Sequence, residues 1–378
     1  LNVEESSIHI NYADLLDAVN VGDRITVDNG LINFEVLEKH ERHMRCRVLD
    51  GGLLKSKRHV NLPGVRVNLP AITPKDTKDI LFGLERDVDF IALSFVREAG
   101  DIQQLKALMG DKVGRVKIIA KIEDQEGVKN LESIIKESDG IMVARGDLGV
   151  EINLEDLPNV QRTIVRLCAE YGKRVIVATH LLESMIHHPH PTRAEVTDVA
   201  NAIYEEADAV MLSGETTVGK YPVKCVEYLR RIALKSETIP GLQFAKRLRD
   251  VGNKQQLAAA AVQLAEGVKA KGIVVITRRG IMADLVANCR PFVTNIYAFT
   301  NMSQPRRTML LNRGVFPFKI DFSSEPEKTL QTAFRILKDR ERFQAGDKVV
   351  IISDVLAQQR VDSIQIRDVP SDDLPVDA

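Results

Sequence analysis

Short apolar runs alternate with helical patterns through the middle of this 378-residue chain. The runs that indicate strands are residues 90–93, 116–120, 140–144, 175–178 and 209–212. Helical patterns separate them, among them residues 101–109, 131–137, 158–171 and 193–206. Near-continuous apolar strands that alternate with helices are typical of parallel sheets, in which both faces of each strand are buried. The pattern therefore predicts an α/β fold made of βα units.

Polar residues with catalytic potential follow every one of these strands. In chain order they are Ser94, Lys121 with Glu123, Arg145 with Asp147, Thr179, and Ser213 with Glu215. An open doubly wound sheet gathers its chemistry at one switch point, whereas a (β/α) barrel gathers it from every strand end. We therefore predict a (β/α)8 TIM-type barrel.

Only five strands of such a barrel are visible. Residues 70–231 fall well short of the roughly 250 residues of a complete barrel. A five-stranded arc leaves unpaired edges and an open core. We expect that three strands lie outside this chain or that another polypeptide supplies them.

The regions on either side of the barrel strands have different patterns. Residues 1–68 carry short β-like runs and turn signals, which predict a small β-rich domain. Residues 69–237 hold the barrel strands, and residues 238–378 form a second α/β block with strands near 273–276, 296–299, 314–318 and 348–352. The acidic, proline-containing tail at 371–378 is expected to be disordered.

Charge and cysteine content exclude several classes of protein. The chain has 52 Lys and Arg residues against 53 Asp and Glu residues, so no net field favours nucleic acid or an anionic membrane. No apolar stretch approaches the ~20 residues of a membrane helix. The four cysteines have no paired spacing, which is typical of reduced thiols, and we expect a cytoplasmic protein.

Two neighbouring strand ends bring together a lysine and two carboxylates. Lys121 and Glu123 are two residues apart on an extended chain and so share one face. Asp147 follows the next apolar run. This set of side chains suits a divalent cation and an anionic substrate.

Longer motifs carry a family resemblance. They are residues 121–123 (KIE), 141–151 (IMVARGDLGVE), 178–186 (ATHLLESMI), 191–195 (PTRAE), 198–202 (DVANA) and 211–216 (MLSGET). Together they resemble the pyruvate kinase family, over the whole chain and most strongly over residues 85–230. The resemblance implies phosphoryl transfer from phosphoenolpyruvate to ADP, giving pyruvate and ATP, in a homotetramer. It also implies a β lid inserted in the barrel, with the first three barrel strands upstream of this chain, and an α/β C-terminal domain.

The resemblance assigns roles to the strand-end residues. Glu123 and Asp147 match ligands of Mg²⁺ or Mn²⁺. Lys121 matches the lysine that meets the transferring phosphoryl group and stabilises the enolate. Ala144, Arg145, Gly146 and Asp147, with Ser94 and Thr179, match the substrate-binding set. An alternative for Arg145 is a structural ion pair across the barrel mouth.

The remaining implied roles concern the proton, the nucleotide and an effector. Thr179 lies near the substrate methylene carbon in the family, and Ser213 and Glu215 extend a proton relay, unless these hydroxyls only cap helices. Arg58 and Asn61 fall in a lid segment that resembles the family's basic stretch, and closure of the lid would bring Arg58 to the nucleotide phosphates. Asp28 begins a turn that faces the same cleft. The alternative is a charged edge of the lid without a role in binding. The turn Thr277, Arg278, Arg279 and Gly280 predicts an effector phosphate site. Substitutions at 281–282 and 353–357 favour a monophosphate effector, or none, over fructose bisphosphate.

Several alternatives stay open. K⁺ is a possible second cation, although its ligands in the family lie mostly in the upstream strands. Without those strands we expect this chain alone to be inactive. The rival hypotheses are another metal-dependent barrel that handles phosphoenolpyruvate or pyruvate, such as an aldolase, and a non-catalytic assembly fragment.

Overall fold

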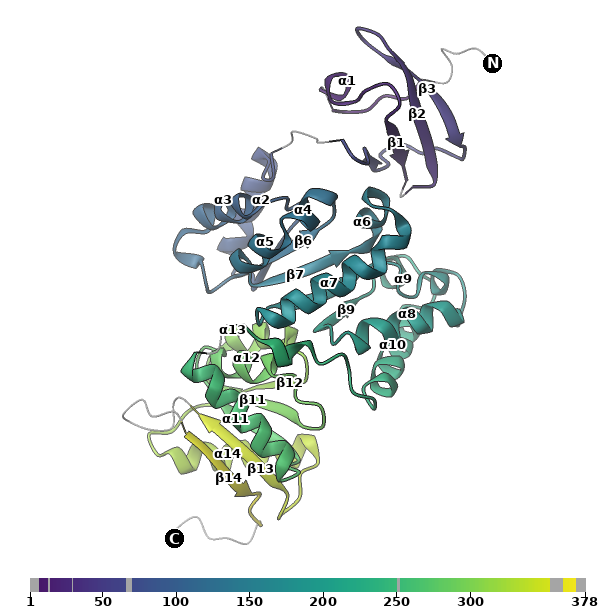
Figure 1. Cartoon of the computed structure of the whole chain (residues 1–378). Helices are drawn as coiled ribbons and strands as arrows, with labels where there is room; N and C mark the ends of the chain where they lie inside the picture. Colours follow the sequence, from purple (N-terminus) through teal and green to yellow (C-terminus); the bar gives the residue numbers. More distant parts are fainter. Residues whose placement is uncertain are drawn as a thin grey trace.

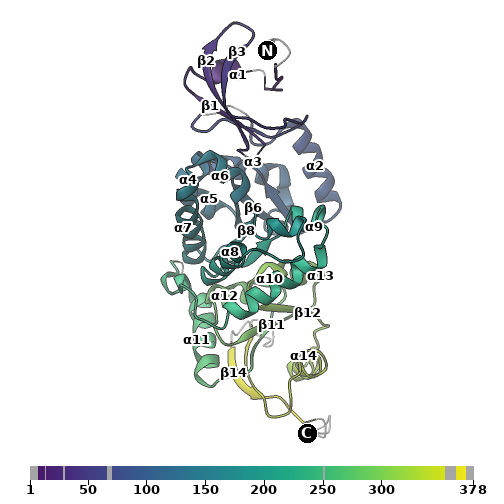
Figure 2. The same ribbon diagram turned by 90° about the vertical axis from the view of Figure 1, so that its right-hand side faces the viewer.

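Figure 1 shows the computed structural model of the chain as three parts arranged along one axis. The structure describes residues 7–12, 14–28, 30–65, 70–249, 252–353 and 363–371. An antiparallel sheet lies at the N-terminal end, a parallel sheet in the middle and a mostly parallel sheet at the C-terminal end. The turned view in Figure 2 shows the same order, so the molecule is elongated.

The N-terminal part, residues 7–65, is a small four-stranded sheet that we call the lid. Its strand order is β3-β2-β1-β4, and all neighbours are antiparallel. The elements are α1 (Leu15–Ala18), β1 (Arg24–Val27), β2 (Ile32–Lys39), β3 (Met44–Asp50) and β4 (Val60–Asn61). Its core is small, because it contains only Leu15, Val19, Ile25, Val27, Ile32, Val36 and Leu62 as buried hydrophobic residues among those described.

The middle part, residues 70–236, holds the five strands that the sequence predicts, and we call it the barrel part. They pair in parallel in chain order: β5 (Phe90–Leu93), β6 (Lys117–Ile122), β7 (Gly140–Ala144), β8 (Arg174–Ala178) and β9 (Ala209–Met211). The helices are α2 (Pro74–Glu85), α3 (Ala99–Met109), α4 (Gln125–Lys129), α5 (Leu131–Glu137), α6 (Arg145–Glu151), α7 (Leu157–Glu170), α8 (Arg193–Tyr204), α9 (Gly214–Thr217) and α10 (Pro222–Ser236). Each predicted strand agrees with the observed one to within two residues.

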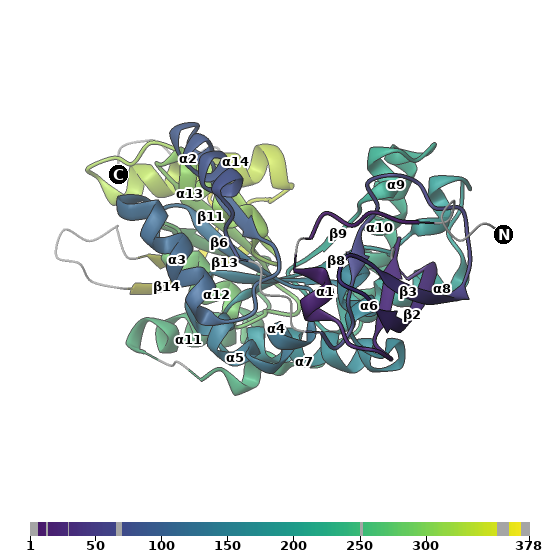
Figure 3. The same cartoon turned by 90° about the horizontal axis from the view of Figure 1, so that it is seen from above.

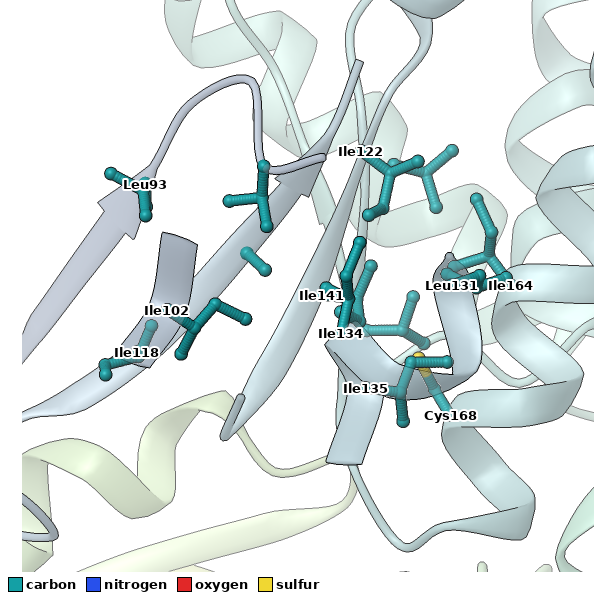
Figure 4. Packing of buried hydrophobic residues seen from close by; sticks show 14 of the residues in the cluster. Leu93, Ile102, Ile118, Ile122, Leu131, Ile134, Ile135, Ile141, Ile164 and Cys168 are labelled. Atoms are coloured by element: carbon teal, nitrogen blue, oxygen red, sulfur yellow. The ribbon is translucent and has the colours of Figure 1, made fainter. Parts of the chain in front are cut away.

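The main core lies between this sheet and its helices. Figure 4 shows strand side chains such as Ile118 and Ile141 facing helix side chains such as Ile102 and Ile134. Local signals place the helices. For example, Thr73 caps α2 by accepting a hydrogen bond from the Asp76 N–H, which is a capping box with proline at the first helical position.

The two faces of β6 have different roles. Ile118, Ala120 and Ile122 belong to the core against the helices, whereas Ile119 belongs to a separate cluster on the other face. Because side chains alternate along a strand, Lys121 lies on the same inner face as Ile119. The ammonium group of Lys121 therefore lies on the inner face of the sheet, near the C-terminal end of β6.

The C-terminal part, residues 253–371, is a sheet of order β12-β11-β10-β13-β14, in which only β14 is antiparallel. Its strands are β10 (Gly272–Ile276), β11 (Asn295–Thr300), β12 (Val315–Lys319), β13 (Lys348–Ser353) and β14 (Ser363–Asp368). Its helices are α11 (Asn253–Gly267), α12 (Ile281–Asn288), α13 (Ser303–Thr308) and α14 (Pro326–Glu341). Short 3-10 helices lie in the barrel part, at η2 (Gly110–Lys112), η3 (Leu154–Asp156) and η4 (Glu183–Ile186). Another, η5 (Phe244–Arg247), lies between the two parts, and η6 (Met309–Leu311) lies in the C-terminal part.

Buried ion pairs join the C-terminal part to the barrel part. The side chain of Asp208, just before β9, is fully buried and pairs with Arg290, whose Nη2 lies 2.7 Å from Oδ2. Arg174, the first residue of β8, donates to Asn288 at the end of α12 at 2.7 Å. These contacts lie at the N-terminal ends of the strands, opposite the polar residues that follow them.

Other sequence predictions have mixed outcomes. All four cysteines are free, as predicted. Among the described residues no helix has the length and apolar character that crossing a membrane requires. The expected boundary at residues 68/69, the loop at 354–357 and the tail at 372–378 lie outside the residues that the structure describes.

Candidate active site

The lysine at the end of β6 is held by two polar side chains. Lys121 Nζ lies 2.7 Å from Oε1 of Glu123 and donates to Oγ of Ser94 at 2.8 Å. Ser94 follows β5, the neighbouring strand, so two strand ends fix one ammonium group. The Lys121 side chain keeps 24% of its surface exposed, which leaves room for a substrate oxygen.

Glu123 is buried at the base of this group, with 1% of its surface exposed. Its second oxygen, Oε2, accepts a hydrogen bond from the Phe95 N–H at 2.6 Å. Phe95 has a left-handed backbone, with φ of 50°, which turns the chain after β5 toward the carboxylate. A carboxylate that is removed from water needs such partners, and those of Glu123 are the ammonium group of Lys121 and the N–H group of Phe95.

Asp147 lies in the first turn of α6, which follows β7 directly. Its Oδ1 lies 3.2 Å from Nδ1 of His59, a residue of the lid just before β4. The Asp147 side chain is 24% exposed. The structure thus brings a lid side chain onto a predicted metal ligand.

Arg145 is buried, and its guanidinium ties three elements together. It donates to the carbonyl oxygen of Thr179 at 2.6 Å and to Oδ1 of Asp198 in α8 at 2.7 Å. Its Nη1 also lies 3.5 Å from Oε1 of Gln161 in α7. These are the contacts of the structural ion pair that the sequence left open as an alternative to substrate binding.

Thr179 is fixed in an unusual backbone conformation. Its φ is +70° and that of His180 is +53°, which is costly for a β-branched residue. The Thr179 hydroxyl accepts from the Gly146 N–H at 2.7 Å and donates to the Ala178 carbonyl at 2.7 Å. Because Arg145 also holds the Thr179 carbonyl, the surroundings determine where this hydroxyl lies.

Glu215 is fully buried and joins the loops that follow β8 and β9. Oε1 accepts from the Leu182 N–H at 3.0 Å, and Oε2 accepts from the Ser213 N–H at 2.8 Å. The Ser213 carbonyl accepts from the hydroxyls of Thr216 and Thr217. Glu215 therefore positions these loops in this structure.

The three lid residues that were predicted to bind the nucleotide make two contacts, one within the lid and one with α6. Arg58 Nη1 lies 3.2 Å from Oδ1 of Asp28, so these two contact each other. Asn61 Nδ2 donates to Oε1 of Glu151, the last residue of α6, at 3.0 Å. Burial raises the pKa of Glu151, the hydrogen bond from Asn61 opposes this rise, and the Asp124 and Asp147 carboxylates add to it.

A large cavity lies between the lid and the barrel part. Its volume is about 1600 Å³, above the usual range for a small-ligand pocket, so it has room for a nucleotide. Arg58 and Asn61 line it from the lid, and Arg97 and Lys129 line it from the barrel part. It borders the Lys121 site through Phe95, although Lys121 itself does not line it. Seen from above in Figure 3, the lid lies over the α6 side of the barrel part and away from α3.

The residues present fit Mg²⁺ or Mn²⁺. Glu123 and Asp147 offer hard oxygen ligands, and each carboxylate oxygen keeps a lone pair beyond the contacts described. Within the described part of the chain, no group of three or more His, Cys, Asp or Glu side chains could hold a metal. Two protein carboxylates with further ligands from substrate and water are typical of Mg²⁺ sites.

The predicted effector turn lies in the C-terminal part, away from the strand ends of the barrel part. Thr277 follows β10 and is buried, and its hydroxyl has no hydrogen-bond partner among the described residues. The same holds for Oδ1 of Asn301, which follows β11. Gly280, with φ of +82°, precedes α12, and Arg278 and Arg279 are exposed.

Sequence reasoning did not identify three residues at the site: His59, Phe95 and Glu151. His59 stands in the basic segment 57–59, which was the one available signal. Phe95 acts through its backbone N–H, and Glu151 acts through a residue 90 positions away. Neither contact has a signature in the local sequence.

Comparison with known families and proteins agrees with this geometry. The family description "Pyruvate kinase, barrel domain" matches residues 1–226, and "Pyruvate kinase, alpha/beta domain" matches residues 255–366. The chain is 41% identical over 371 residues to Plastidial pyruvate kinase 2 of Arabidopsis thaliana, covering 96% of this chain and 64% of that protein. It is 41% identical over 375 residues to Pyruvate kinase isozyme G, chloroplastic, of Ricinus communis, covering 97% and 88%. It is also 41% identical over 360 residues to Pyruvate kinase of Dictyostelium discoideum, covering 92% and 71%.

The chain spans less than two thirds of the length of the Arabidopsis relative. The first matching description nevertheless covers more than half of the chain, including Lys121, Glu123, Asp147 and Thr179. The chain belongs to the pyruvate kinase family.

Proposed function

We propose that the protein transfers the phosphoryl group of phosphoenolpyruvate to ADP, giving pyruvate and ATP. The observation that carries the proposal is Lys121, held between Ser94 and the buried Glu123 next to the strand end that carries Asp147. Phosphoryl transfer depends on positioning and on neutralising negative charge, which is what a fixed ammonium group provides.

In this proposal Lys121 contacts the phosphoryl oxygens during transfer and then the enolate oxygen that remains. A compact ammonium group suits both, because it is a point charge with three donors. Glu123 and Asp147 hold Mg²⁺, or Mn²⁺, which when bound would neutralise charge on substrate oxygens. Ser94 keeps the ammonium group in place, and Ala144 with the first turn of α6, Arg145 to Asp147, would receive the substrate carboxylate.

Thr179 is proposed to deliver the proton that converts the enolate to pyruvate. Its hydroxyl is fixed by the Gly146 N–H and the Ala178 carbonyl, which supports a defined position beside the bound substrate. A hydroxyl that gives up its proton must receive another one. The loop after β8 is partly exposed, which gives the Thr179 hydroxyl access to solvent. Ser213 and Glu215 fix the neighbouring loop and extend the relay.

The finer assignments are proposals as well. Arg58 and Asn61, which line the cavity, would contact the nucleotide, with Asp28 holding Arg58 in place. The turn from Thr277 to Gly280 would bind a monophosphate effector, or no effector at all. K⁺ as a second cation, a homotetramer and a cytoplasmic location stay predictions. The names of two relatives above refer to plastids or chloroplasts, so fractionation of cells is the test of location.

The direct test is formation of pyruvate from phosphoenolpyruvate and ADP with Mg²⁺, with and without K⁺, on a sample of known intact mass. Binding of phosphoenolpyruvate is measured beside turnover, so a sample that binds without turnover is recognised. Pyruvate formation without a nucleotide would favour an aldolase-like enzyme instead. Absence of both binding and turnover would contradict the proposal.

A further inference from the structure

Strand β4 of the lid and His59, the residue before it, lie along helix α6 of the barrel part and contact it at two points. His59 Nδ1 lies 3.2 Å from Oδ1 of Asp147, and Asn61 Nδ2 donates to Oε1 of Glu151 at 3.0 Å. The two lid residues are two positions apart on an extended chain. The two carboxylates are four positions apart on the helix.

The spacing of these residues lets both contacts form together. Two residues of a strand span roughly 6.6–6.8 Å and side chains two apart share a face. Four residues of an α-helix span roughly 6 Å and also share a face. A shift of one residue in β4 would turn both lid side chains away from α6, so this register is specific.

His59 also contacts the neighbouring strand end. Its ring stacks on Phe95, with centroids 6.3 Å apart and an angle of 27° between the rings. The Phe95 N–H in turn donates to Glu123 at 2.6 Å. His59 therefore touches one metal carboxylate, Asp147, and the residue that orients the other. Asn61 is buried, so its contact with Glu151 is shielded from water.

We propose that His59 and Asn61 form a clasp that closes the lid on α6, and that His59 competes with the divalent cation for Asp147. An N–H group at Nδ1 and a cation both need lone pairs of the same carboxylate, and their positive ends repel each other. Cation binding therefore releases His59, while Asn61 keeps its hold on Glu151. This inference rests on the proposed function only in taking Asp147 as a metal ligand.

The competition is reciprocal. If the clasp weakens cation binding by some factor, cation binding must weaken the clasp by the same factor. His59 is thus a positioning residue, which acts through Asp147 and not on the substrate. Loss of His59 should raise cation affinity and at the same time loosen the lid, because Asn61 then holds the clasp alone.

The first test is the dissociation constant for Mn²⁺, measured by electron paramagnetic resonance without substrate. We expect His59→Ala to tighten Mn²⁺ binding by about two- to fivefold, the usual worth of one largely exposed ion pair. His40→Ala is the matched control, because His40 is a lid histidine that pairs with Glu38 inside the lid. Unchanged affinity in His59→Ala, or an equal change in His40→Ala, would overturn the clasp.

The second test is hydrogen exchange of residues 57–62 and of α6, with and without Mg²⁺. We expect Mg²⁺ to speed exchange in the wild type, and to add little in His59→Ala, which already exchanges fast. Asn61→Leu should also free the lid and tighten Mn²⁺ binding. A freed lid with unchanged Mn²⁺ affinity in Asn61→Leu would show that His59 is no competitor.

Failure of the clasp and failure of the proposed function remain distinguishable. Both measurements are made without phosphoenolpyruvate or ADP, and Asp147→Asn reports whether Mn²⁺ sits at this carboxylate. Mn²⁺ binding through Asp147 that responds to His59, with neither binding of phosphoenolpyruvate nor pyruvate formation, would overturn the proposed function and keep the clasp.

Discussion

At the scale of single residues, Lys121 is the group on which the proposed chemistry depends most. In a form of the protein that turns over, we expect Lys121→Met to lower turnover by about 10²–10³-fold, the usual cost of removing one donor that stabilises developing charge. The loss should appear in kcat, because the ammonium group matters most during transfer.

Lys117→Met is the matched control for this variant. Lys117 opens the same strand at its other end and pairs with Asp139 at 3.2 Å. Pyruvate formation is compared between the two variants. The Tm of each variant is measured as well, to show that both are as stably folded as the wild type. Equal activity in Lys121→Met and the wild type would exclude Lys121 from the reaction.

A second residue-scale prediction concerns Glu215, whose two oxygens each accept one backbone N–H. Glu215→Leu should leave the N–H groups of Leu182 and Ser213 unpaired, at a cost of about 1–3 kcal/mol each in the free energy of unfolding. Urea denaturation measures this cost, and Glu183→Leu, at an exposed position on the same loop, is the control. A loss no larger than that of the control would contradict the positioning role.

The contrast between these residues shows what the sequence can predict. Lys121 and Glu123 were found because alternation along a strand places them on one face, and this rule is local. The contact of Glu215 with Leu182 depends on the pairing of β8 with β9, which places the two loops side by side. His59 reaches Asp147 only through the fold of the lid, so no local pattern contains it.

At the scale of elements, the apolar strands of the two α/β parts were predicted well, whereas one edge strand and one helix of the C-terminal part were missed. β7 matches its predicted range, since its five residues are all buried. β14 was missed, because it is an antiparallel edge strand in which four of the six residues are polar. α14 was also missed, although its buried residues, among them Leu330, Phe334 and Leu337, recur at helical spacing.

Asp208, at the interface between β8, β9 and α12, leads to a prediction of how the stability of the protein depends on pH. Burial acts to raise the pKa of Asp208, but Arg290 and Arg174 outweigh it and hold the pKa below its ordinary value. A carboxylate with a lowered folded-state pKa stabilises the fold above its unfolded pKa, about 3.9, and the effect is lost as pH falls through the folded value. We therefore expect Tm to fall steeply below about pH 4.

Asp208→Asn tests the origin of this pH dependence. The variant should lose about 3–5 kcal/mol at neutral pH, because it leaves the buried Arg290 without its anion, and its Tm should depend less on pH below 4. Asp79→Asn is the control, since Asp79 belongs to an exposed pair with Lys75. A pH profile identical to that of the wild type would assign the acid sensitivity to other carboxylates.

At the scale of the whole molecule, the three parts are joined in different ways. The C-terminal part meets the barrel part through buried ion pairs such as Asp208 with Arg290, and through Arg307 with Asp89 at 2.6 Å. The lid meets the barrel part through polar side-chain contacts such as Asn61 with Glu151, across a large cavity. We infer that the barrel and C-terminal parts move as one body and that the lid moves against them.

The lid should also unfold first. Its core holds few buried hydrophobic residues, and a domain this small buries too little apolar surface to be very stable alone. We expect hydrogen exchange at moderate urea to show loss of protection in β1 and β2 before β6 and β10. Val36→Ala, which opens a cavity in the lid core, should lower the first transition by about 2 kcal/mol or more and leave the second unchanged, whereas Ile141→Val should affect only the second. Simultaneous loss of protection in all three sheets would mean that the lid contacts are strong enough to make the molecule one cooperative unit.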